Sequence, residues 1–115
     1  MASTFKNAGI TVPVVDTSAG NLFTAGASST AVIHALYISN KSETASATVN
    51  VKVTTDGGST FYHIGKSLEV PPNNTLTLDK PVNLESSDKI RIVADANPDS
   101  SSVDVEAYAS ILELT

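Results

Sequence analysis

Four oxygen-bearing side chains near the C-terminal end of the chain have the spacing of a calcium-binding loop. Asp95, Asn97 and Asp99 stand at positions 1, 3 and 5 of such a loop. Glu106 falls at position 12, where the loop takes a carboxylate. The pattern departs from the loop at position 6, where Ser100 replaces the glycine of the sharp turn, and strands rather than helices are predicted on both sides. Turns rich in Asp and Asn also occur between strands for conformational reasons, so both interpretations stay open.

The two histidines are the other side chains that could act as bases. Nucleophilic catalysis needs a serine or cysteine beside such a base, and the chain has no cysteine and no Gly-x-Ser-x-Gly motif. His34 lies inside an apolar run, and we interpret it as a half-buried strand residue. His63 follows a turn, and we expect it at the surface or in an interface. The acidic residues fall mostly in predicted loops instead of facing one cleft, so we predict no catalytic site and no enzyme.

The composition bears on several other classes of protein. With 115 residues the chain fits one domain, residues 1–115. It is 41% hydrophobic and 17% charged, which is too apolar for a disordered chain. Its net charge is -5 and its seven basic residues occur singly, which argues against nucleic-acid binding. There is no apolar run long enough to span a membrane. The lack of cysteine and of a signal-peptide pattern favours maturation in the cytoplasm. We expect no cofactor, no nucleic acid and no membrane partner.

The elements that must position these side chains are predicted to be strands. Val49, Val51 and Val53 alternate with polar residues, as in a strand with one buried face. The run 29–39 is apolar on both parities, which predicts a central strand covered on both sides.

A second alternation predicts the last strand of the chain. It runs over residues 103–111, after which Leu112 and Leu114 take the opposite parity. This switch predicts a bulge or a change of partner strand near Ile111.

Turn signals separate the strands at intervals of roughly 8 to 12 residues, the spacing of a sandwich or barrel. Residues 56–59, Asp-Gly-Gly-Ser, predict a tight hairpin turn. Pro71 and Pro72 cannot lie inside a sheet ladder, because neither has an N–H to donate. We count eight to nine strands and predict an all-β fold, a single antiparallel β-sandwich of jelly-roll or immunoglobulin-like type.

Several short segments follow one another in a familiar order. They are Ile38-Ser39-Asn40, the Val49–Val53 alternation, Tyr62-His63-Ile64-Gly65-Lys66, Leu68-Glu69-Val70-Pro71, the segment from Leu84 to Ile92, and Val103-Asp104-Val105. Their order resembles that of small virion structural proteins of tailed bacteriophages, notably cyanophage-like proteins of the capsid decoration (cement) type. The resemblance spans nearly the whole chain, and each motif is a turn plus an alternation rather than a chemical signature.

The resemblance implies a structural protein of the virion, assembled in the host cytoplasm, that binds the major capsid protein and stabilises the head. It also implies a homo-oligomer, with a trimer favoured. A neck, tail or baseplate accessory protein is the alternative in the same class. A carbohydrate-binding module on the virion surface is the alternative from another class, although the chain has no tryptophan and its six other aromatic residues are scattered.

The N-terminal stretch, residues 1–15, is predicted to be either a docking arm or an edge strand of the domain. It carries apolar side chains at Phe5, Ile10, Val12 and Val14, and Pro13 disfavours a central strand. Together with His63, these four are the predicted interface residues.

Overall fold

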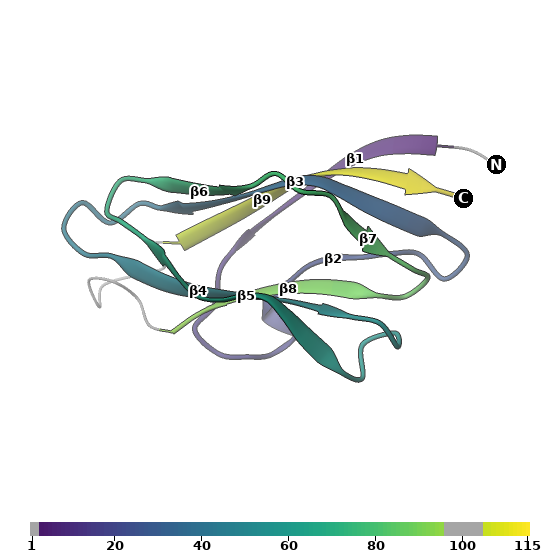
Figure 1. Ribbon diagram of the computed structural model, residues 1–115, viewed down its shortest axis with the longest axis horizontal. Coiled ribbons are helices and arrows are strands. Elements are labelled where there is room, and N and C mark those ends of the chain that lie inside the picture. The colour runs from purple at the N-terminus through teal and green to yellow at the C-terminus, as the bar shows by residue number, and fades with distance from the viewer. Residues whose placement is uncertain (1–2, 96–104) are drawn as a thin grey trace.

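A computed structural model describes residues 3–95 and 105–115, and these residues form nine strands in two antiparallel sheets (Figure 1). This confirms the predicted all-β sandwich. No helix in the described part of the chain has the length and apolarity needed to cross a membrane. The elements are β1 (Ser3–Thr11), the 3-10 turn η1 (Ser18–Gly20), β2 (Asn21–Thr24), β3 (Thr30–Asn40), β4 (Ala47–Thr54), β5 (Phe61–Val70), β6 (Thr75–Leu78), β7 (Val82–Leu84), β8 (Lys89–Ala94) and β9 (Val105–Leu114).

The order of the strands identifies the type of sandwich. One sheet has the order β1-β9-β3-β6, with β7 also paired to β3, and the other has the order β2-β8-β4-β5. The pairs are nested along the chain: β4 with β5, β3 with β6 and β7, β2 with β8, and β1 with β9. The chain is therefore one long hairpin rolled up so that β3 also meets β9 and β4 also meets β8. This winding is a jelly roll, one of the two predicted types.

β3 is central in its sheet, but only one of its faces packs against the other sheet. Its register with β9 shifts between Ile33 and Ala35. Inward-facing positions are therefore odd before the shift, as at Ile33, and even after it, as at Leu36. This bulge explains why apolar residues occur on both parities, so the predicted cover on both sides was wrong. His34 lies at the bulge and is exposed, so the half-buried interpretation was wrong as well.

β9 itself runs without a bulge and keeps both partner strands to its end. The irregularity predicted near Ile111 exists, but it lies on β3, opposite this residue. Because the parity of β9 continues, Leu112 faces outward and Glu113 faces inward with 6% of its surface exposed. The Glu113 carboxylate is ion-paired to Lys6 and accepts a hydrogen bond from the Gly26 N–H at 3.2 Å. These contacts lower the pKa of Glu113, with the Lys6 hydrogen bond as the largest cause.

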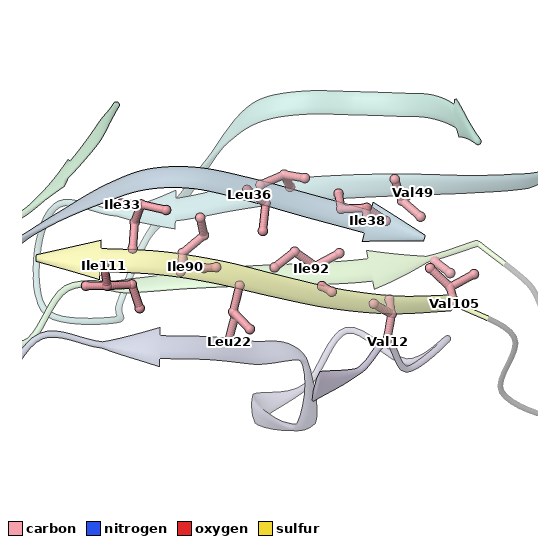
Figure 2. Packing of buried hydrophobic residues seen from close by; sticks show 14 of the residues in the cluster. Val12, Leu22, Ile33, Leu36, Ile38, Val49, Ile90, Ile92, Val105 and Ile111 are labelled. Atoms are coloured by element: carbon pink, nitrogen blue, oxygen red, sulfur yellow. The ribbon is translucent and has the colours of Figure 1, made fainter. Parts of the chain in front are cut away.

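The core lies between the two sheets and consists of aliphatic side chains from both (Figure 2). Burial of each larger side chain contributes about 1.5–3 kcal/mol. The largest fully buried residues are Val12, Ile33, Leu36, Ile38, Val49, Val51, Val70, Leu84, Ile90, Ile92, Val105 and Ile111.

The β4–β5 hairpin has the predicted glycine turn. Gly57 and Gly58 have φ values of 77° and 112°, a region that favours glycine. The Asp56 carboxylate accepts hydrogen bonds from the N–H groups of Ser59 (3.0 Å) and Thr60 (2.9 Å). The Thr60 hydrogen bonds are the largest cause of the lowered pKa of Asp56. The turn therefore leads directly into β5, the edge strand of the second sheet.

Candidate interaction surface

The sheet that contains β1 turns one side toward solvent. Directly opposed residues on its strands share this side and form cross-strand rows. We call these residues the outer face. They are Phe5, Leu112 and Val32; Asn7, Ser110 and Ala35; Gly9, Tyr108 and Tyr37; and Thr11, Glu106 and Ser39.

Aromatic side chains stand out on the outer face. Phe5 is 83% exposed, the largest value among the exposed large hydrophobic residues. Tyr37 and Tyr108 are opposed across β3 and β9, and their ring centroids lie 6.2 Å apart. Glu106 is the one charged residue of this set, and it pairs with Lys41 at 3.3 Å. Exposed apolar surface with little charge is typical of a protein contact.

A shallow hollow of about 390 Å³ lies at one end of the outer face. Its lining includes Gly9, Tyr37, Tyr108 and Glu106. Gly9 leaves open the space that a side chain would occupy, because a Cβ atom built there would have no neighbour closer than the Ala107 carbonyl oxygen at 3.6 Å. The hollow therefore lies where Gly9 of the edge strand β1 is opposite Tyr108 of β9.

Sequence reasoning missed this grouping of aromatic residues. Tyr37 and Tyr108 lie far apart along the chain, so the sequence alone shows them as scattered. The available signal was that Tyr108 occupies a polar parity of its strand, since it alternates with Ala107 and Ala109. The opposing position of Tyr37 depends on the register of β3 and β9, including the bulge.

The second sheet carries an ionic cluster on its own outer side. Asp16, from the β1–β2 connection, is ion-paired to Lys52 and lies 3.0 Å from Arg91. The Lys52 hydrogen bond is the largest cause of the lowered pKa of Asp16; Arg91 adds to this, and burial opposes it. Arg91 also donates to the Asn21 side chain at 2.8 Å and lies 4.1 Å from the centroid of the Phe61 ring. Because Lys52 is 8% exposed, the cluster is a structural clamp that holds the connection onto this sheet.

The structure does not gather the five predicted interface residues into one surface. Phe5 belongs to the outer face, whereas Ile10 packs against the core and Val12 is 1% exposed within it. Val14 is 41% exposed in the connection after β1. His63 is exposed on β5, in the other sheet, where its backbone is opposite Lys52. The described part of the stretch 1–15 includes β1, an edge strand paired with β9.

Two of the four predicted calcium ligands, Asn97 and Asp99, lie outside the described residues. Asp95 accepts a hydrogen bond from the Asn50 side chain at 3.0 Å, and Glu106 is paired with Lys41. Within residues 3–95 and 105–115, no group of three His, Cys, Asp or Glu side chains is placed to hold a metal ion.

Neither a family model nor a curated protein sequence matches the chain. Solved structures share its fold. The acidic stable capsid structure of Helicobacter pylori bacteriophage KHP30 has a chain with 15% identity and a TM-score of 0.51, matched over 100% of this chain and 89% of that chain. The Drosophila NLP core, studied for pentamer formation and histone binding, has 11% identity and a TM-score of 0.50, over 96% of this chain and 98% of that one.

A third match is to the infectious bursal disease virus Gx strain, with 10% identity and a TM-score of 0.52. It covers 98% of this chain but 30% of that chain, so the matched region is one part of a longer chain. At these identities the likeness shows a shared fold, and a fold alone does not assign a function.

Proposed function

We propose that the chain is a structural protein of a virus particle, more specifically a capsid decoration protein that binds the major capsid protein and stabilises the head. The observation that carries the proposal is the jelly roll, which the KHP30 capsid structure matches over the full length of this chain and most of its own. Jelly rolls are recurrent in viral capsids. The order of motifs in the sequence points to the same class of protein.

The chemistry of the described surfaces supports a binding role over a catalytic one. His34 and His63 lie in different sheets, so they do not combine into one site. The strands of the second sheet carry four cations. Lys52 and Arg91 are engaged by Asp16, and Lys89 donates to the carbonyl oxygens of Gly57 and Ser87, so these three do not form an open basic patch. The outer face is weakly charged and aromatic, which suits contact with another protein surface. Many copies on a lattice would multiply the strength of each weak contact.

The proposal includes a homo-oligomer located on the virion, and sedimentation velocity decides between the trimer that the sequence resemblance favours and another number of subunits. Within the predicted docking stretch, Phe5 and Val14 are available to a partner, since Ile10 and Val12 serve the core. Deletion of residues 2–9 tests this stretch. We expect fewer copies on the capsid, and unchanged occupancy would remove the stretch from the contact.

The number of copies per particle tests the proposal as a whole. Quantitative mass spectrometry of purified virions, with the major capsid protein as internal reference, should give hundreds of copies. A few to a dozen copies would assign the chain to the neck, tail or baseplate instead. Absence from purified virions would overturn the virion role altogether. Loss of the chain should also lower the temperature at which heads release their genome.

A second candidate function is a carbohydrate-binding module on the virion surface, and the Tyr37–Tyr108 pair favours it. Two exposed rings beside Glu106 and Ser39 combine aromatic faces with hydrogen-bonding groups in one hollow. A glycan array tests it. Binding that Tyr37→Ala abolishes would support the module, and an array without signal would exclude it.

A further inference from the structure

The edges of the two sheets are not equally protected against pairing with another chain. An exposed, regular edge strand is a template for a further strand, and proteins block such edges by short strands, bulges, proline or charge. Three edges carry such blocks. β6 and β7, which both pair with β3 on one edge of the first sheet, have four and three residues. β2, at one edge of the second sheet, has four residues, and its register with β8 shifts between Asn21 and Phe23. β5 is long, but its register with β4 shifts twice.

β1 carries almost none of these blocks. It pairs with β9 through nine consecutive residues without a register shift. Proline is absent from Ser3–Thr11, and Lys6 is the one charged residue. The Lys6 ammonium is engaged by Glu113. Among the described residues β1 has a partner strand on one side, and on its other side it presents a regular, weakly charged row of backbone donors and acceptors.

We propose that β1 pairs in antiparallel fashion with β1 of a second copy, about a two-fold axis through Asn7. The contact is isologous, so each residue contact away from the axis occurs twice. In this register Asn7 is opposite Asn7 of the second copy, and Ser3 is opposite Thr11. The two sheets join into one continuous sheet across the axis.

This register places Phe5, the most exposed large hydrophobic side chain of the outer face, opposite Gly9, which has no side chain. Phe5 of one copy lies opposite Gly9 of the other copy, on the same side of the joined sheet. The ring enters the hollow beside Tyr108, and symmetry repeats the contact. An aromatic side chain across from an edge glycine is a known way to pin a sheet register.

The other residue pairs across the axis introduce no electrostatic repulsion. Lys6 falls opposite Ala8, and Thr4 falls opposite Ile10, so no like charges face each other. A nine-residue strand is about 30 Å long, and each buried phenyl ring adds about 150 Å². The interface is at the small end for specific complexes, near 1,000 Å² in order of magnitude, which is the size of weak and transient contacts. The inference concerns the chain alone and does not depend on the proposed function.

Single cysteines test the axis, because the natural chain has none. Directly opposed residues in antiparallel strands have Cα atoms about 4.5–5.5 Å apart, which suits a disulfide. Asn7→Cys should therefore form a covalent dimer on mild oxidation. In Ser3→Cys the two cysteines of a dimer are about 27 Å apart, so this variant should not cross-link alone. It should cross-link when mixed with Thr11→Cys. Equal cross-linking of Asn7→Cys and Ser3→Cys, or none by Asn7→Cys, would overturn the register.

Sedimentation velocity over a concentration series tests the contact without cross-linking. The wild-type chain should pass from monomer to dimer, and Phe5→Ala should raise the dissociation constant at least about tenfold. Tyr62→Ala is the matched control, because Tyr62 is 55% exposed on β5, and it should have no effect.

Charged residues at the axis should abolish dimerisation in each single variant and restore it in a mixture of opposite charges. Asn7→Lys and Asn7→Glu should each be monomeric, because like charges are then directly opposed, and an equal mixture of the two should dimerise. A wild-type chain that is monomeric at every concentration, or trimeric as the resemblance favours, would overturn this inference. Either result leaves the copy-number test of the proposed function intact.

Discussion

The two long edge strands of this jelly roll, β1 and β5, differ in how they end their sheets. β1 follows β9 residue for residue, whereas β5 departs from β4 at two bulges. At one of these bulges Ser67 takes a φ of 54°, and its N–H donates to the Asn50 side chain at 2.9 Å. A strand bent and satisfied in this way is a poor template for another chain. The same fold thus closes one edge and leaves the other available for association.

The glycines of the two edges show the difference at atomic scale. A Cβ atom at Gly65 on β5 would lie 2.5 Å from Leu68 Cδ1, whereas a Cβ atom at Gly9 on β1 would make ordinary contacts at 3.6 Å and beyond. Gly65 is therefore constrained by packing within the domain, because an alanine there would force the Leu68 side chain to move. Gly9 is not, which suggests that its open space serves a contact outside the domain.

The largest expected difference in stability is between alanine substitutions of these two glycines. Gly65→Ala should destabilise the monomer by about 1–3 kcal/mol, because Leu68 must shift within a packed region. Gly9→Ala should leave it unchanged or stabilise it by about 0.5 kcal/mol, through lower entropy of the unfolded chain. Urea unfolding at low protein concentration measures both. Equal losses at the two sites would contradict the contrast between the edges.

The next effect concerns the clamp between the connection after β1 and the sheet that contains β5. Asp16→Asn should destabilise the domain by about 1–2 kcal/mol, because Lys52 is nearly buried and loses its carboxylate. The loss is limited because the Asp16 side chain is 53% exposed, so solvent screens its charge. Asp79→Asn, on an exposed loop residue, is the control and should be neutral. A neutral Asp16→Asn would show that the clamp is not a stabilising element.

Acid should weaken ion pairs on both sheets together. The pKa values of Asp16 and Glu113 are lowered from their ordinary 3.8 and 4.5 in the folded chain. The unfolded chain therefore takes up protons first as the pH falls. The stabilisation is complete at neutral pH, begins to decline near pH 5, and is lost as the pH falls through the lower folded values.

Thermal unfolding between pH 7 and pH 3 checks this, with an expected fall of several degrees in Tm below pH 5. Glu113→Gln should show a shallower dependence on pH. A Tm that rises on acidification would contradict the assigned ion pairs.

The smallest effect concerns the bulge of β5. Ser67→Gly should stabilise the domain by about 0.5 kcal/mol, because glycine adopts a positive φ without steric cost. Ser110→Gly in β9 is the matched control and should destabilise by a similar amount, since its strand conformation needs no glycine. Denaturant midpoints of the two variants should move in opposite directions.

The sequence was sufficient for features that depend on local chemistry. The Val49–Val53 alternation predicted β4, and the Asp56-Gly57-Gly58 turn predicted the hairpin to β5. Both depend on residues adjacent in the chain, so pattern and turn chemistry are enough.

Features that depend on register could not be predicted. The bulge at His34 reversed the parity of β3 and moved the expected irregularity from Ile111 to its partner strand. Leu112 and Leu114 suggested a change of parity in β9, whereas the alternation continues and Glu113 faces inward. The Tyr37–Tyr108 pair and the hollow beside Gly9 arise only when strands distant in sequence are aligned.

The most direct test of the contrast between the edges is amide hydrogen exchange measured at low and high protein concentration. If β1 is the open edge, amides of Ser3–Thr11 become more protected as the concentration rises, because β1 gains a second partner strand, while those of Phe61–Val70 do not change. Greater protection of Phe61–Val70 with no change in Ser3–Thr11 would contradict the contrast.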